Sequence, residues 1–104
     1  MPRLFEVRRV VGLRAESPVD LAVVVQDDTL SHLSTRVLAP LVPAFRDATI
    51  DRSAPLVEID GLRYAVAMHL LTTVPVRNLG ALVGSLQDDE RTLKNAIDMV
   101  FAGI

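Results

Sequence analysis

The sequence contains no cysteine and no tryptophan, and aromatic residues make up only 4% of its 104 residues. Without cysteine there is no disulfide, no thiolate nucleophile and no thiolate metal site, which agrees with a reducing compartment. One tyrosine and three phenylalanines leave few rings that could stack on nucleic-acid bases. These absences remove several common kinds of chemistry before any motif is considered.

Long apolar runs are also missing, although half of the residues are hydrophobic. No stretch approaches the roughly 18 apolar residues that a membrane-spanning helix needs. The opening MPRLFEVRRVVG is interrupted by Arg3, Glu6, Arg8 and Arg9, which leaves no apolar region for a secretory signal. We therefore expect a cytoplasmic protein whose excess apolar surface is covered in a subunit interface.

Strong charge of one sign is absent as well. Eleven basic and thirteen acidic side chains give a formal net charge of −2. Such a chain has no general attraction to a phosphate backbone, so nucleic acid is not favoured as its direct ligand.

No motif for catalysis, metal binding or cofactor binding stands out. The two histidines, His32 and His69, do not have the i, i+4 spacing of a metal pair. Gly80 and Gly84 do not build a phosphate-binding loop, because the Walker lysine and hydroxyl are absent. We expect a binding protein without a cofactor or catalytic residues of its own.

Patterning predicts strands over most of the chain. The expected strands are residues 4–11, 21–25, 35–42, 56–59 and 64–70. Asp60-Gly61 predicts a tight antiparallel hairpin, since both residues tolerate positive φ. Pro40 is expected at an edge, a bulge or a strand end because it cannot donate to a ladder. Residues 79–84 are expected to form a short turn of helix.

The last segment has a different period. Apolar residues recur three and four positions apart and predict a closing helix from about Asp88 to Phe101. They are Leu93, Ala96, Ile97, Val100, Phe101 and Ile104. The sequence thus predicts one domain over residues 1–104, mainly β, with a small antiparallel sheet or barrel and a C-terminal α-helix.

Five stretches carry a resemblance to a known family: LAVVVQDD, RVLAPL, PLVEIDG, TTVPV and, at the end of the chain, LKNAIDMVFAGI. Together they resemble the CcdB family of gyrase-poisoning toxins from bacterial toxin–antitoxin modules. The resemblance covers most of the chain except residues 11–20 and 43–54. It implies a small SH3-like antiparallel barrel, of the kind that the MazF toxins share, and a homodimer with its C-terminal helices near the two-fold axis.

The resemblance also implies a function. Toxins of this family insert into the gate of the gyrase A subunit and trap the enzyme on cleaved DNA, without catalysis of their own. Their poisoning tip is a terminal Trp-Gly-Ile, which corresponds here to Ala102, Gly103 and Ile104, preceded by an aromatic residue at Phe101. Alanine has no ring face to stack on a guanidinium, so the tip departs from the family at one position.

Resemblance further implies an antitoxin. A CcdA-type partner would wrap the toxin with its disordered C-terminal half, and Thr29, Leu30 and Asp98 occupy positions expected to face it. Residues alone leave other functions open. One is a family member that has lost gyrase poisoning and acts on another topoisomerase or only binds antitoxin. Another is a MazF-like endoribonuclease that uses Arg36, Arg63 or Arg77, although isolated arginines are more often solvated surface residues.

Overall fold

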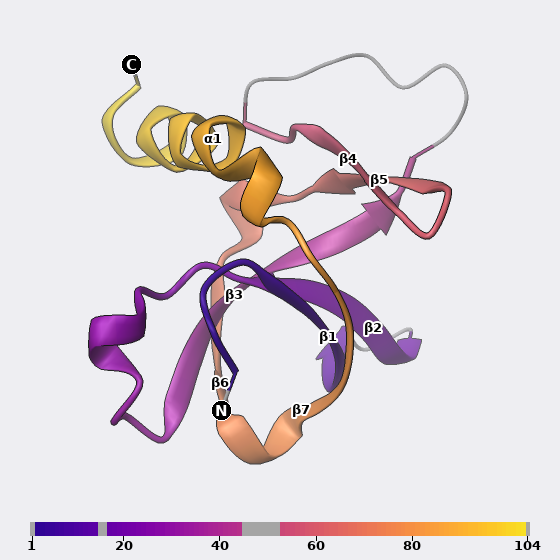
Figure 1. Cartoon of the computed structure of the whole chain (residues 1–104), viewed down its shortest axis with the longest axis vertical. Coiled ribbons are helices and arrows are strands. Elements are labelled where there is room, and N and C mark those ends of the chain that lie inside the picture. Colours follow the sequence, from indigo (N-terminus) through magenta and orange to yellow (C-terminus); the bar gives the residue numbers. More distant parts are fainter. Residues whose placement is uncertain (1, 15–16, 45–52, 104) are drawn as a thin grey trace.

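The fold is mainly β, in a computed structural model that describes residues 2–14, 17–44 and 53–103 (Figure 1). The strands are β1 (Glu6–Arg14), β2 (Ser17–Val24), β3 (Thr35–Pro43), β4 (Leu56–Ile59), β5 (Leu62–Val66), β6 (Thr72–Pro75) and β7 (Leu79–Ser85). One α-helix, α1 (Glu90–Ala102), follows them. The prediction of a mainly β chain with a C-terminal helix is confirmed, and the curled sheet is consistent with a small SH3-like barrel.

All strand pairs are antiparallel, in the order β4-β5-β3-β2-β1-β7, and β6 joins β3 beside this path. β3 is shared by two layers, because its first half pairs with β2 and β6 and its last residues pair with β5. Pro40 lies inside β3, so its expected place at an edge, bulge or strand end is wrong. It is tolerated where the β2 ladder ends at the Ala22–Pro40 pair and the β5 ladder begins at Leu41–Val66.

The hairpin prediction is confirmed. Asp60 and Gly61 have φ of 51° and 80°, and they connect β4 to β5 with Ile59 opposite Leu62. Two successive residues with positive φ match the twist of the flanking strands, which is why Asp-Gly is favoured here.

Residues 79–84 form a strand, so the predicted helical turn is wrong. Their glycines disfavour a helix but fit β7 beside β1, where a Cβ added to Gly80 would approach the Arg9 carbonyl oxygen to 3.3 Å. The predicted strand 64–70 ends early, at Val66, and His69 lies exposed in a 3-10 turn, η2 (Met68–Leu70).

Two apolar clusters fill the interior. The smaller lies within the curled sheet and contains Val10, Ala22, Val24, Leu38 and Val74. The larger joins strands of both layers to α1 through Leu93 and Ala96, and it includes Phe5, which is 1% exposed. Phe5 is therefore a core residue. No helix within the described ranges is long and apolar enough to cross a bilayer.

Candidate functional site

The predicted tip lies at the exposed end of α1. Phe101 is 72% exposed, and Ala102 and Gly103 are also exposed. Gly103 has φ of 71° and donates its N–H to the Met99 carbonyl oxygen at 3.1 Å, which ends the helix in a left-handed cap. Ile104 lies outside the described residues, so its predicted contact stays a prediction.

Phe101 does not belong to the buried face of the helix, contrary to the sequence pattern. Leu93 and Ala96 are buried, and Ile97 and Val100 pack against the same core. Each residue turns the helix by about 100°, so Phe101 points well away from Val100. An aromatic ring is thereby presented to solvent one residue before the alanine.

The residues predicted to face an antitoxin lie on two elements. Thr29 and Leu30 are exposed in η1 (Asp28–Leu30), between β2 and β3, and Asp98 is exposed on α1. The Thr29 backbone N–H donates to Asp27 at 2.8 Å and, with the Thr29 side chain and the charge of Lys94, holds the pKa of Asp27 below its usual value.

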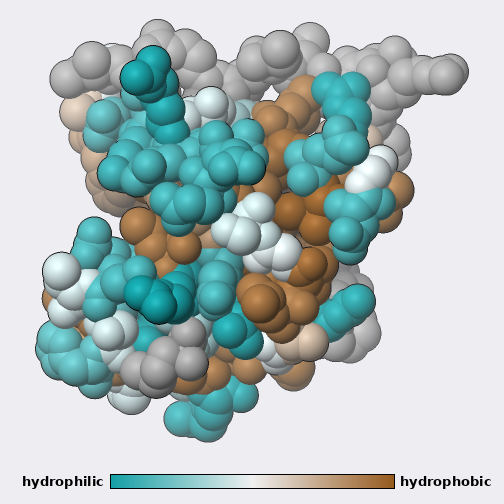
Figure 2. All heavy atoms as spheres, in the orientation of Figure 1, coloured by the Kyte–Doolittle hydropathy of each residue, from teal (hydrophilic) through white to brown (hydrophobic). Residues whose placement is uncertain are grey.

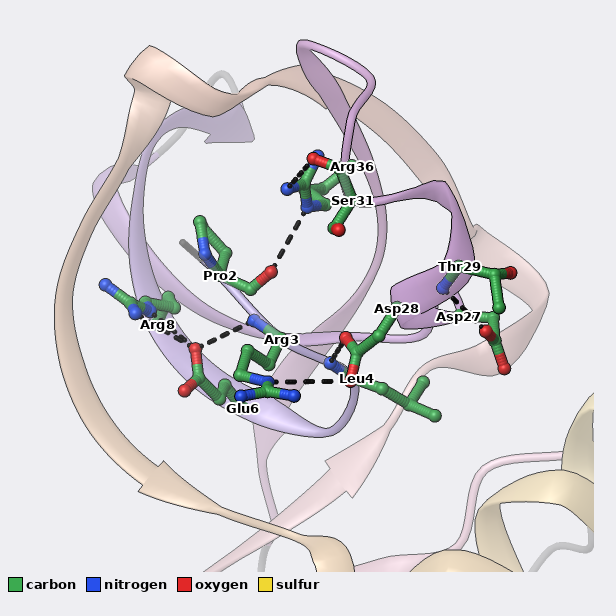
Figure 3. Close-up of polar contacts among 10 residues, drawn as sticks. All are labelled: Pro2, Arg3, Leu4, Glu6, Arg8, Asp27, Asp28, Thr29, Ser31 and Arg36. Carbon is green, nitrogen blue, oxygen red and sulfur yellow. Dashed lines mark hydrogen bonds and ion pairs between the residues drawn. The ribbon is translucent and has the colours of Figure 1, made fainter.

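Arg36, a candidate residue of the endoribonuclease alternative, does not lie where the sequence predicted. Its side chain is 1% exposed, so its expected place on a solvated surface is wrong. Its guanidinium donates to the carbonyl oxygens of Ser31, Leu33, Thr35 and Pro2 at 2.7–3.2 Å. Figure 3 shows the bonds to Ser31 and Pro2. Nothing in the sequence around Arg36 signals this burial, because the acceptors are backbone groups.

The N-terminal segment is tied to η1 in the same region. The Leu4 N–H donates to Asp28 Oδ1 at 2.8 Å, and the exposed Arg3 side chain lies 3.6 Å from Asp28 Oδ2 (Figure 3). Glu6 Oε1 accepts from the Arg3 N–H and from the Arg8 guanidinium, both at 2.9 Å. Burial alone would raise the pKa of Glu6, but these donors and the Arg8 charge outweigh it and lower that pKa.

Glu6→Gln should therefore lower stability in a pH-dependent way. A carboxylate whose pKa falls on folding stabilises the folded state at any pH above its unfolded pKa of about 4.3. This stabilisation is lost as the pH falls through the lower pKa that the group has in the folded state. We expect a loss of about 0.5–1 kcal/mol at pH 7 that shrinks as the pH drops below about 4.3, measured by urea unfolding. An equal loss at every pH would contradict a charge effect.

An open concavity of about 530 Å³ adjoins this network. Arg3, Leu4, Glu6 and Asp28 line one part of it, and Leu82, Gly84, Ser85 and Gln87 line the other. None of the predicted site residues is among them. Across the described part of the chain, no group of three histidine or carboxylate side chains gathers as a metal site would require.

This chain is similar to known proteins in its sequence and in its fold. A family model described as CcdB protein matches residues 5–103, nearly all of the predicted 1–104 domain. Among solved structures, a mycobacterial endoribonuclease in complex with its cognate antitoxin superposes with a TM-score of 0.78 at 14% identity, covering 96% of this chain and 94% of that chain. The Mycobacterium tuberculosis toxin MazF-mt6 gives 0.74 at 19% identity, with 92% and 95% covered.

At these identities the structural likeness shows the fold alone. The family match is different in kind, because it rests on the sequence and extends from the buried Phe5 to the cap residue Gly103. The chain therefore belongs to the CcdB family, the family of toxin–antitoxin toxins that its sequence resembles.

Proposed function

We propose that this protein is the toxin of a type II toxin–antitoxin module, and that it binds the DNA gyrase A subunit and traps the gyrase–DNA cleavage complex. The observation that carries the proposal is the exposed end of α1, where Ala102 and Gly103 stand at the first two positions of the family's Trp-Gly-Ile tip and Phe101 at the aromatic position before it. The proposed protein has no catalytic activity of its own, and the trapped gyrase causes the DNA damage.

Phe101 is the natural substitute for the absent tryptophan in this proposal. Its ring is the most exposed large hydrophobic side chain among the described residues. An aromatic face can stack on an arginine of the target, and large aromatic side chains dominate many interfaces. Gly103, without a side chain, lets the last turn enter a narrow gate.

A homodimer and an antitoxin complete the proposed module. Exposed apolar side chains supply surface for a dimer, and Figure 2 shows such surface beside the β4–β5 hairpin, whereas the visible face of α1 is largely hydrophilic. Within the described part of the chain, the large hydrophobic residues that are more than half exposed are Val11, Leu62, Leu70, Leu82 and Phe101. A CcdA-type antitoxin would contact Thr29, Leu30 and Asp98, and the complex of a fold neighbour with its own antitoxin supports such a partner.

One alternative has a specific observation in its favour. Ala102 removes the family's stacking ring, so this member could have kept antitoxin binding while losing gyrase, or have moved to another topoisomerase. The endoribonuclease hypothesis is weaker, because Arg36 is buried and its guanidinium donates to backbone carbonyls rather than facing solvent. RNA cleavage that disappears in Arg63→Ala or Arg77→Ala would revive it.

A gyrase assay tests the proposal. The wild-type protein should inhibit supercoiling and trap cleaved DNA with gyrase from the same organism. Phe101→Ala should weaken trapping about fivefold without loss of stability, because the ring contacts solvent and not the core. A variant that lacks Ile104 should trap gyrase more weakly still, because Ile104 is part of the proposed tip contact.

Asn95→Ala is the matched control, since Asn95 is exposed on α1 more than one turn before the tip. It should trap gyrase like the wild type. If the wild type neither inhibits nor traps gyrase, the proposal fails and the alternative of lost poisoning takes its place.

A further inference from the structure

The guanidinium of Arg36 is buried, which is unusual for a charged side chain. Taking an arginine out of water is costly unless its donors are satisfied, and Arg36 satisfies them with four backbone carbonyls. Two of those carbonyls, of Ser31 and Leu33, belong to the segment between β2 and β3, and that of Thr35 belongs to the first residue of β3. The arginine thus fixes the path of a surface segment from beneath.

Gln26 also holds the backbone of this segment through side-chain hydrogen bonds. It is 8% exposed, and its Nε2 donates to the carbonyl oxygens of Leu30 and Thr35, both at 3.2 Å. Its Oε1 accepts from the Val37 N–H at 3.3 Å, which holds the amide in place. Together, the buried side chains of Arg36 and Gln26 therefore donate to the carbonyl oxygens of Leu30, Ser31, Leu33 and Thr35.

The segment so held presents two leucines to solvent. Leu30 is 44% and Leu33 is 42% exposed, and the Leu33 N–H donates to the Leu30 carbonyl oxygen at 3.0 Å, which keeps them in one turn. In Figure 1 this purple segment projects from the side of the barrel. Three charged groups, of Arg3, Asp27 and Asp28, lie beside it and supply a polar rim.

A projecting apolar turn is best covered by a chain that can wrap around it. A disordered tail does this readily, but it loses conformational entropy when it orders, so a rigid site raises its affinity. A second folded copy would need a matching groove instead. The shape and the rigidity of the turn together favour a flexible partner.

We propose that Arg36 and Gln26 are positioning residues for antitoxin binding, which hold Leu30 and Leu33 as a paired anchor for the antitoxin's disordered tail. This inference rests on the proposed antitoxin partner and adds Leu33, Arg36 and Gln26 to its site. The anchors touch the partner, and the positioning residues act through them.

The first test concerns the anchors. The probe is the polypeptide encoded by the reading frame directly upstream of the toxin gene, and its association and dissociation rates are measured on the full-length toxin. Leu30→Ala combined with Leu33→Ala should weaken binding about tenfold, mainly through faster dissociation. Thr73→Ala, a truncation of an exposed side chain on β6 outside the turn, should bind like the wild type.

The second test concerns the positioning residues. Arg36→Lys and Gln26→Met should speed hydrogen exchange at the amides of Leu30, Ser31 and Leu33 and weaken antitoxin binding to a similar degree. The core amides of Phe5 and Leu86, which donate to Val24 and Phe5, should stay protected. The double leucine variant should lose binding but keep the exchange protection of the turn.

The outcomes separate the two levels of the proposal. If the probe binds wild type and the double leucine variant equally, the anchor is wrong while the antitoxin partner stands. If Arg36→Lys opens the turn but binds the probe at wild-type affinity, the positioning role is overturned. If the probe does not bind the wild-type toxin, the proposed partner fails and this inference fails with it.

Discussion

Ala102→Trp should strengthen gyrase trapping by more than tenfold. The substituted residue lies at the exposed end of α1, so a tryptophan fits there without disturbing the core. An aromatic hot-spot side chain is typically worth about 2 kcal/mol relative to alanine, which corresponds to about thirtyfold in affinity. The measurement is the concentration of toxin that gives half-maximal DNA cleavage with gyrase from the same organism.

Two comparisons give this result its meaning. Asn95→Trp places the same ring at an exposed position of α1 more than one turn before the tip, and it should leave trapping unchanged. If Ala102→Trp alone gains activity over an inactive wild type, one side chain explains the loss of poisoning in this chain. If the wild type is potent and Ala102→Trp adds nothing, Phe101 already supplies the aromatic contact.

Arg36→Met should cost about 2–4 kcal/mol of unfolding free energy. The methionine side chain roughly fills the space but donates nothing, so buried carbonyls on two separate segments lose their partner. Each unsatisfied buried acceptor is costly by about 1–3 kcal/mol, reduced where water reaches it. Urea unfolding followed by circular dichroism measures the loss.

Arg77→Met is the matched control, because Arg77 is exposed in the 3-10 turn η3 (Val76–Asn78). It should change stability by less than about 0.5 kcal/mol. If the wild type and Arg36→Met are equally stable, the guanidinium is not needed for the stability of the fold. Its role would then be limited to ordering the turn between β2 and β3.

Local signals predicted the elements that local chemistry decides. The Asp60-Gly61 hairpin follows from two residues that tolerate positive φ, and α1 follows from its three- and four-residue period. β7 was missed because its apolar residues and glycines carry no strand period, and only pairing with β1 makes them a strand. Long-range pairing of this kind leaves no local trace.

The candidate site divides in the same way. The tip residues were found by resemblance, and their exposure agrees with a contact surface. Arg36 was misplaced because a charged residue is expected at the surface unless its partners are known, and its partners are backbone carbonyls of the distant Pro2 and of the turn just before β3.

The position of β1 in the sheet bears on when the protein can fold. β1 is near the start of the chain, yet it pairs with β2 on one side and with β7 on the other, so that Glu6 stands opposite Ser85. Contacts between residues so far apart in sequence slow folding, and an unpaired strand edge invites association. While a ribosome is still synthesising residues 79–85, β1 has one open edge and α1 does not yet exist. The second ladder of β1 can therefore form only after Leu79–Ser85 has been synthesised, so the edge of an early strand stays open until a late strand covers it.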